Sequence, residues 1–243
     1  MFAVNHSRDR SVQNMFDRIA GRYDLLNRVI SFRLDARWRR QAIRAVLRGA
    51  QPRILDIGTG TGDLVLNAAA IAKGNGNFVG LDFSPRMLNL AQAKRARAAH
   101  RASTAFVLGS AMFAPFKKSQ FDGAMAAFVL RNVSDLPLFF AESMRVLKPG
   151  GRFVSLDMFP PEPSWFATLY SIYFHYLMPR MGGFLAQDRS AYQYLSDSVR
   201  QFHPPATVAE IIRAAGFEHV TIRKFLSGAV CMHVADKPRA SAS

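Results

Sequence analysis

The chain has a single cysteine, Cys231, among its 243 residues. One thiol cannot form an intramolecular disulfide or supply a cysteine cluster for zinc or iron–sulfur, so a reducing compartment is expected. No apolar run reaches the roughly 18 residues needed to cross a bilayer, and the amino-terminal residues lack the apolar core of a signal peptide. The histidines form no ligand pair, and no metal is expected. We therefore expect a cytoplasmic protein.

Acidic residues are scarce, with 17 Asp and Glu against 32 Lys and Arg, which gives a net charge of +15. Residues 1–50 carry eleven Arg and four Asp, a local excess of seven positive charges. Such an excess favours contact with an anionic membrane face or a polyanion, while an ordinary solvated surface is an equal alternative. A basic nucleic-acid-binding protein remains a hypothesis, although no nucleic-acid module is recognisable and none is expected as a partner.

Short apolar segments alternate with helix-like segments through the middle of the chain. Two helices are predicted first, over residues 11–30 and 36–48, because their apolar residues recur at helical spacing. Alternation of this kind predicts an α/β fold with a doubly wound, mostly parallel sheet and helices on both faces. Strands are expected over 53–58, 77–83, 104–110, 121–130 and 150–159, with helices over 63–73, 85–99 and 136–148.

The rhythm breaks after Phe159. An aromatic-rich stretch follows, in which residues 165–179 contain no Lys, Arg, Asp or Glu. The stretch could line an apolar channel or rest on lipid, and a buried helix over the sheet is an equal alternative. The chain closes with a helix that ends near Gly216 and two strands joined at Ser227 and Gly228, which predicts a C-terminal antiparallel hairpin.

The strongest local pattern is ILDIGTGTGD over residues 54–63, a buried strand that runs into a glycine turn and a helix. The dinucleotide fingerprint GxGxxG fails here, because Asp63 and Val65 stand where the third glycine is required. No GK[ST] follows, so a P-loop is excluded as well. Asp56 and Asp63 flank the loop and suit a cationic ligand better than a pyrophosphate. S-adenosylmethionine, with a sulfonium and an α-ammonium, fits this charge pattern, and we predict it as the cofactor.

Further cofactor contacts are expected at the carboxyl ends of the neighbouring strands. Asp82, about twenty residues beyond the loop, is predicted to accept the ribose hydroxyls, although capping of the next helix is an alternative. Ser110 and Ala111 are expected near the adenine. The full set of predicted cofactor residues is Asp56, Gly58, Gly60, Thr61, Gly62, Asp82, Ser110, Ala111 and Ala127.

Several motifs together resemble the ubiquinone/menaquinone biosynthesis C-methyltransferase family. These are the first motif, with Arg22 to Asn27 and Trp38 to Arg40; the LRNV and LKPGG sequences at 130–133 and 147–151; and the C-terminal block with Tyr192 to Val199 and Gly228 to His233. The resemblance covers roughly residues 11–238. Val129 departs from the family's usual glycine before Leu130, and Ser110 stands where an aspartate is common.

The resemblance implies a class I methyltransferase, Rossmann-like fold and an enzyme that methylates a ring carbon of a polyprenyl quinol. It also implies that Arg131, Asn132 and Tyr23 face this substrate as catalytic residues. Naphthoquinol and benzoquinol rings both remain open, as does a homodimer. A methyltransferase for another small lipid or phenol is the alternative within enzymes, and peripheral contact with an anionic membrane is expected.

We expect four regions along the chain. Residues 1–50 would form a helical cap on the substrate side, and residues 51–160 the core that binds S-adenosylmethionine. Residues 161–203 would form an aromatic helical insertion or lid. Residues 204–243 would supply the helix and the hairpin that complete the core sheet.

Overall fold

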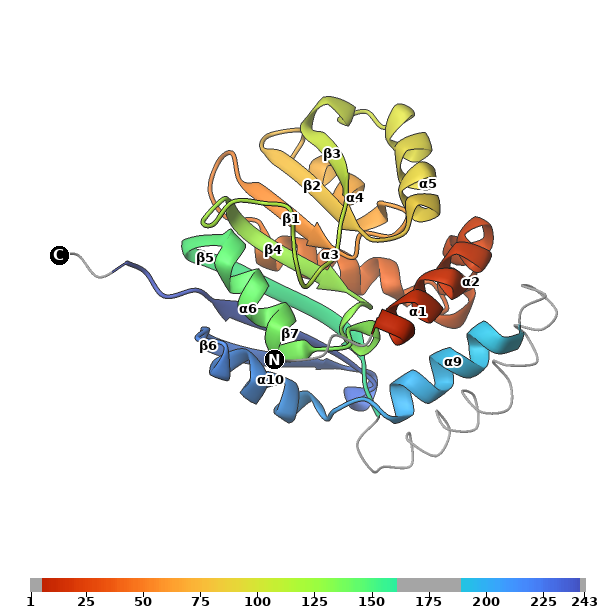
Figure 1. The fold of residues 1–243 in the computed structure, drawn as a ribbon. Coiled ribbons are helices and arrows are strands. Elements are labelled where there is room, and N and C mark those ends of the chain that lie inside the picture. Colours follow the sequence, from red (N-terminus) through yellow and green to blue (C-terminus); the bar gives the residue numbers. More distant parts are fainter. Residues whose placement is uncertain (1–5, 161–188, 241–243) are drawn as a thin grey trace.

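A seven-stranded sheet runs through the centre of the molecule in the order β3-β2-β1-β4-β5-β7-β6 (Figure 1). The computed structural model describes residues 6–160 and 189–240. Strands β1 to β5 pair in parallel, and β7 pairs antiparallel with both β5 and β6. The strands are β1 Arg53–Ile57, β2 Asn77–Asp82, β3 Thr104–Leu108, β4 Phe121–Ala127, β5 Leu147–Met158, β6 Glu218–Phe225 and β7 Val230–Asp236. The predicted sheet and its C-terminal hairpin are confirmed.

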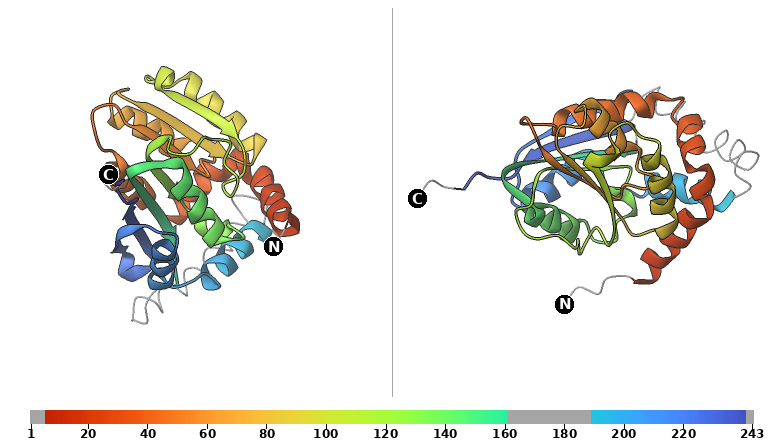
Figure 2. Two further views of the ribbon diagram at one scale, coloured as in Figure 1. Left: turned by 60° about the vertical axis from the view of Figure 1, so that its left-hand side comes forward. Right: turned by 90° about the horizontal axis from the view of Figure 1, so that it is seen from above.

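Helices cover both faces of this sheet (Figure 2). Helices α3 and α4 pack on one face, and α6 and α10 pack on the other. No described helix is long and apolar enough to cross a bilayer. The described α-helices are α1 His6–Ile19, α2 Tyr23–Ile30, α3 Leu34–Val46, α4 Asp63–Ile71, α5 Pro85–Ala96, α6 Leu136–Val146, α9 Arg189–Arg200 and α10 Pro205–Ala214.

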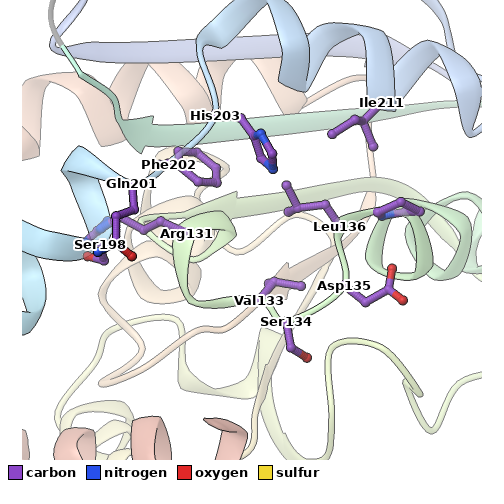
Figure 3. A pocket seen from close by; sticks show the side chains of 11 residues that line it. Arg131, Val133, Ser134, Asp135, Leu136, Ser198, Gln201, Phe202, His203 and Ile211 are labelled. Atoms are coloured by element: carbon purple, nitrogen blue, oxygen red, sulfur yellow. The ribbon is translucent and has the colours of Figure 1, made fainter. Parts of the chain in front are cut away.

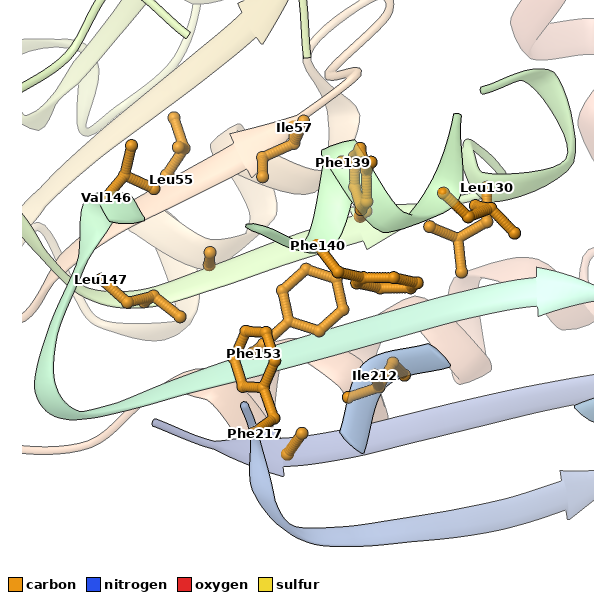
Figure 4. Packing of buried hydrophobic residues seen from close by; sticks show 14 of the residues in the cluster. Leu55, Ile57, Leu130, Phe139, Phe140, Val146, Leu147, Phe153, Ile212 and Phe217 are labelled. Carbon is orange, nitrogen blue, oxygen red and sulfur yellow. The ribbon is translucent and has the colours of Figure 1, made fainter. Parts of the chain in front are cut away.

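The core has two layers because successive strand residues point to opposite faces of the sheet. In β1, Ile54 packs in the layer under α3 and α4, whereas Leu55 packs in the layer under α6 and α10. The second layer is rich in phenylalanine, with Phe139, Phe140 and Phe153 all fully buried (Figure 4). Their rings meet edge to face at centroid distances of 5.2 to 6.1 Å, an arrangement that aromatic pairs favour.

The amino-terminal segment differs from the expected pair of helices. The predicted helix over 11–30 is broken by a 3-10 turn at Ala20–Arg22, so three helices precede the sheet. Gly21 lies in the break, and glycine weakens a helix interior by up to about 1 kcal/mol relative to alanine. The break lets α2 turn toward the glycine loop, where Asp24 of α2 contacts Thr61 and bridges Lys94 of α5.

The LKPGG sequence also folds differently from the expected helix over 136–148. Helix α6 ends at Val146, and Leu147 already pairs with Phe121 of β4. The register between β4 and β5 then shifts before Gly123 pairs with Arg152. Gly150 has a φ of +74°, which a side chain would strain. The motif is therefore an irregular entry into β5. Most of the predicted aromatic lid, residues 161–188, lies outside the described residues.

Candidate functional site

The glycine loop between β1 and α4 uses its amide hydrogens within the protein. Gly58 N and Thr59 N both donate to the carbonyl of Leu81, and Gly62 N donates to Thr59 O. Gly60 N donates to the carboxylate of Asp82 at 2.7 Å. A phosphate cradle needs several backbone N–H groups aimed at the ligand. This loop leaves none of these four amides for an anion, which agrees with the charge argument from the sequence.

Glycine is required in the loop for both conformation and space. Gly58, Gly60 and Gly62 have φ values of +71°, +55° and +82°, in the left-handed region. A Cβ on Gly58 would lie 2.5 Å from a methyl of Val129, and a Cβ on Gly62 would lie 2.7 Å from the ring of Phe106. Val129, the departure from the family pattern, therefore packs directly against the loop.

Asp56 lies under this loop and is almost fully buried. Its carboxylate accepts a hydrogen bond of 2.6 Å from the hydroxyl of Thr59. Burial raises the pKa of Asp56 to about 7, although the Thr59 hydroxyl and the positive charge of Arg39 lower it. A cation bound nearby would favour the ionised carboxylate, so Asp56 suits a cationic ligand.

Asp82 at the end of β2 connects the glycine loop with the segment that begins α5. Its carboxylate accepts from Gly60 N and, at 2.9 Å, from Ser84 N. Burial raises the pKa of Asp82, and these backbone donors oppose the rise. The predicted alternative, a cap on helix α5, belongs instead to Ser84, whose hydroxyl accepts from Met87 N. Each carboxylate oxygen of Asp82 keeps a lone pair with which it can accept a ribose hydroxyl.

Thr61 connects the loop to the amino-terminal helices. Its hydroxyl donates to Asp24 of α2 at 2.6 Å and accepts from Lys94 of α5 at 2.8 Å. The ammonium of Lys94 also bridges Asp24 and Asp63. The side chain of Thr61 is thus engaged within the protein. Its predicted contact with the cofactor would have to be made by its backbone.

The remaining predicted cofactor residues lie at two places. Ala127 ends β4 and lines a small cavity of about 30 Å³ together with the loop residues Gly58 to Thr61. Ser110 and Ala111 follow β3, where the hydroxyl of Ser110 accepts from Met112 N at 3.2 Å. The parallel pairing of β3 with β2 brings this segment beside Asp82.

The exit of β4 makes a sharp turn. Phe128 has a φ of +64°, and residues Leu130–Asn132 form a short 3-10 helix. Arg131 is buried there, and its Nη1 donates to Asp157 at the end of β5 at 2.7 Å. Asp157, which is fully buried, also accepts from the backbone N–H groups of Leu130 and Met158, both at 2.8 Å. Burial raises the pKa of Asp157, while Arg131 and these donors oppose the rise.

Asn132 is held by both ends of its side chain. Its amide nitrogen donates to the carbonyl of Phe128 at 3.2 Å, and its oxygen accepts from the hydroxyl of Tyr194 at 3.1 Å. Tyr194 belongs to α9, so this bond joins the LRNV sequence to the C-terminal block that the sequence grouped with it. Asn132 therefore fixes the turn against α9.

The three predicted catalytic residues are not all brought together. Tyr23 lies in the small cavity with the glycine loop and contacts Phe16 edge to face at 5.9 Å. Arg131 instead lines a separate pocket of about 460 Å³ with Ser198, Gln201 and Phe202 (Figure 3). No hydrogen bond joins Tyr23 to Arg131 or Asn132 in the part of the chain that the structure describes.

Sequence reasoning missed Asp157 and Arg39. Asp157 is the single acidic residue in the apolar segment 150–159, at a strand end, which is the signal that identified Asp82. Arg39 lines the cavity at the glycine loop, and its guanidinium lies 5.0 Å above the ring of Phe128. Within residues 6–160 and 189–240, the buried side-chain nitrogens without a hydrogen-bond partner are Nε of Arg39 and Nε of Arg131.

The glycine loop and the side chains around it fit S-adenosylmethionine. The glycines let the loop pass close to Val129 and Phe106, four of its amides are engaged, and carboxylates line the cavity beside it. Such a site suits a ligand with an ammonium and a sulfonium. Among the described residues, no group of three His, Cys, Asp or Glu is arranged to hold a metal.

Solved structures similar to this chain share its fold at low sequence identity. The [4+2]-cyclase SpnF matches with a TM-score of 0.70 at 18% identity over 96% of this chain and 97% of its own. An S-adenosylmethionine-dependent methyltransferase from Thermotoga maritima matches with a TM-score of 0.64 at 20% identity, over 92% and 98%. Because one of these is described as a cyclase, the likeness shows the class I methyltransferase fold and not the reaction.

Sequence relatives are much closer. The demethylmenaquinone methyltransferase of Thermus thermophilus is 42% identical over 92% of this chain and all of its own length, and that of Deinococcus radiodurans is 40% identical over 94% and 93%. The ubiquinone/menaquinone biosynthesis C-methyltransferase UbiE of Geotalea uraniireducens is 36% identical over 98% and 100%.

The family model of the ubiE/COQ5 methyltransferases matches residues 4–237. The match confirms the resemblance, the predicted methyltransferase activity and its cofactor S-adenosylmethionine. The nucleic-acid-binding alternative rested on charge alone and has no support from these matches. With nearly its whole length matched, the chain belongs to the ubiE/COQ5 methyltransferase family.

Proposed function

We propose that this enzyme methylates a ring carbon of demethylmenaquinol, a naphthoquinol with a polyprenyl tail. The observation that carries the proposal is the buried ion pair of Arg131 and Asp157 at the exit of β4. The naphthoquinol ring is favoured over the benzoquinol because the relatives with 39 to 42% identity are named demethylmenaquinone methyltransferases. Relatives whose names include ubiquinone are 35 to 38% identical.

Carbon methylation requires an electron-rich ring, which a hydroquinone gains when it loses a hydroxyl proton. A free phenol has a pKa near 10, so the site must stabilise the phenolate at neutral pH. When bound, S-adenosylmethionine supplies the methyl group as an electrophile on a sulfonium. The guanidinium of Arg131 is the cation proposed to stabilise the phenolate oxygen.

The geometry of Arg131 supports this role. Nη1 is held by Asp157, Nε is buried without a hydrogen-bond partner among the described residues, and the side chain lines the pocket proposed for the substrate. A guanidinium is not a base, so a water next to Arg131 would accept the hydroxyl proton. Overall one proton leaves the ring, because methylation replaces a ring hydrogen.

Asp157 acts through Arg131 in this proposal and is a positioning residue. It is fully buried and contacts Arg131 and two backbone N–H groups, so it does not reach a substrate. Asn132 positions the same turn through Tyr194. Tyr23 is proposed to lie over the glycine loop and to separate the bound cofactor from solvent.

The regions of the chain follow from this assignment. We propose residues 1–50 as the substrate-side cap, 51–160 and 204–243 as the core, and 161–203 as an insertion or lid, of which residues 161–188 lie outside the described residues. Contacts of α1 with the core support the first of these. Asp17 accepts from the hydroxyl of Ser84, and Gln13 donates to the carbonyl of Phe83 at 2.9 Å.

Contact with an anionic membrane is proposed for the segment from α2 to the start of α3. Leu25 and Phe32 are 48% and 66% exposed and lie in the same short segment. Exposed arginines, Arg22, Arg28 and Arg33, are interspersed with them. Apolar side chains combined with cations suit the surface of a bilayer that holds a lipid substrate.

The proposed reaction is tested by supplying demethylmenaquinol and the demethylated benzoquinol precursor separately with methyl-labelled S-adenosylmethionine. Label in the ring of the naphthoquinol, at a kcat/KM well above that of the benzoquinol, is expected. Label in the benzoquinol alone would reject the proposed ring. Label in neither, with measurable cofactor binding, would favour another lipid or phenol as the acceptor.

A further inference from the structure

We propose that Arg39 binds the α-carboxylate of S-adenosylmethionine. Arg39 lies on α3 and lines the small cavity whose other wall is the glycine loop, residues Gly58 to Thr61. This cavity also contains Ala127 at the end of β4, the strand that leads into the turn with Arg131. The inference rests on the cofactor of the family and does not depend on the proposed quinol.

The ligand has both an ammonium and a carboxylate, whereas the cavity is lined by more acidic than basic side chains. Asp24, Asp35 and Asp63 line it, and Asp56 lies beneath the loop. Lys94 bridges Asp24 and Asp63 and compensates part of this charge, and the negative charge that remains can hold the ammonium and the sulfonium. The amides of Gly58, Thr59, Gly60 and Gly62 are engaged with Leu81, Asp82 and Thr59, so these four backbone donors do not hold the carboxylate. A cationic side chain at the cavity is the stronger donor for it.

Arg39 is the cation best prepared for this task. Its side chain is only 12% exposed, and its Nε has no hydrogen-bond acceptor among the residues with described positions. Asp35 Oδ2 lies 3.4 Å from this nitrogen without hydrogen-bond geometry. A buried guanidinium nitrogen that has an ion-pair neighbour and no hydrogen bond costs free energy unless a ligand supplies the acceptor.

The surroundings of Arg39 hold the guanidinium in place without using all its donors. The ring of Phe128 lies under it at 5.0 Å, and the hydroxyl of Ser31 donates to Asp35 at 2.8 Å, which fixes the carboxylate beside it. A guanidinium has five N–H groups in a fork that matches a carboxylate. Arg28, the other cation of the cavity, is exposed and less restrained.

Arg131 does not compete for the same ligand. It lines the separate pocket and is paired with Asp157, so its remaining donors face a different space. The two guanidinium groups whose buried Nε lacks a hydrogen bond therefore serve different ligands: Arg39 the cofactor and Arg131 the acceptor. One serves the anion of the cofactor, and the other serves the anion that forms on the acceptor.

The test compares S-adenosylmethionine with its decarboxylated form, which keeps the sulfonium, the amine and the adenosine and lacks only the carboxylate. Binding is measured by titration calorimetry without an acceptor. The wild type should prefer the complete cofactor by about 10- to 100-fold, as expected for a charge-assisted hydrogen-bonded pair. Arg39→Gln should lose most of this preference, because it weakens the complete cofactor and leaves the decarboxylated form nearly unchanged.

Arg40→Gln is the matched control, since Arg40 is the adjacent, exposed residue of the same helix and does not line the cavity. It should keep the wild-type preference. Arg39→Lys, which keeps the charge, should lie between the wild type and Arg39→Gln, and it replaces Arg39→Gln if that variant does not fold. A wild-type enzyme that binds both forms equally, or an Arg39 variant that weakens both equally, would overturn the proposal.

Discussion

Arg131 and Asp157 form a buried ion pair in which Nη1 and Oδ1 are 2.7 Å apart, between two segments that leave neighbouring strands of the sheet. The second oxygen of Asp157 accepts from the backbone of Leu130, the residue before Arg131. Asp157 therefore holds both the guanidinium and the turn that carries it. Removal of one partner of a buried pair leaves the other charge uncompensated, which is far more damaging than loss of a surface pair.

Asp157→Asn should lower kcat by about 100-fold or more through loss of the aligned guanidinium. The free energy of unfolding should fall by about 3 to 5 kcal/mol, the range for broken buried pairs. Affinity for S-adenosylhomocysteine by calorimetry should change little, because Asp157 does not line the cofactor cavity. Asp157→Glu, which keeps the charge, should recover part of the turnover. Wild-type turnover in Asp157→Asn would remove the positioning role.

Tyr194→Phe should lower kcat by less than about 10-fold, because it removes one neutral hydrogen bond to Asn132. Asn132→Ala should cost more, since it also frees the carbonyl of Phe128. The double variant tells whether the two residues act together: its loss should match that of Asn132→Ala alone. Losses that simply add would mean that Tyr194 acts independently of Asn132.

The stability of the cofactor-free enzyme should depend on Asp56. Its pKa is about 7 in the folded protein and 3.8 in the unfolded chain, so both states are protonated below about pH 3.8. As the pH rises toward 7, the unfolded chain ionises first, and stability falls by roughly 2 to 4 kcal/mol. Asp56→Asn should remove this decline. The melting temperature of the variant, relative to that of the wild type, should therefore increase between pH 5 and pH 8. Parallel pH profiles of the two proteins would contradict the expectation.

Leu25→Ser with Phe32→Ser should reduce co-sedimentation with vesicles that contain anionic phospholipid. Binding of the wild type should weaken with salt, since exposed arginines accompany the two apolar side chains. Ile71→Ser is a matched control, because Ile71 is 38% exposed at the end of α4. Equal binding of all three proteins, or binding that salt does not affect, would count against contact through this segment.

The sequence predicts the seven strands, the glycine loop and Asp82 because each depends on local spacing and on the edge to which parallel strands lead. It does not reveal the partners of the site residues. Asp157 reaches Arg131 across 26 positions, and Tyr194 reaches Asn132 across 62. Such pairs depend on the register between strands and on where a helix returns to the sheet, which periodicity does not encode.

The break at Ala20–Arg22 shows the same limit at shorter range. The apolar spacing of residues 11–30 is compatible with one helix, and Gly21 alone does not predict a change of direction. Contacts with the core decide it, because α1 packs beside α5 through Asp17 and Ser84, whereas α2 reaches the loop through Asp24 and Thr61. This is also why Tyr23 lies at the glycine loop rather than beside Arg131.

The order of the strands has a consequence for the synthesis of this protein. Strand β7 is synthesised after the other six described strands, yet it lies inside the sheet and separates β6 from β5. Every backbone pairing of β6 is with β7, so β6 has to wait for a strand made after it. Until then the side of β5 that β7 will occupy stays open, in a molecule whose first five strands can already pair. The growing chain therefore carries an unprotected sheet edge until β7 has been made.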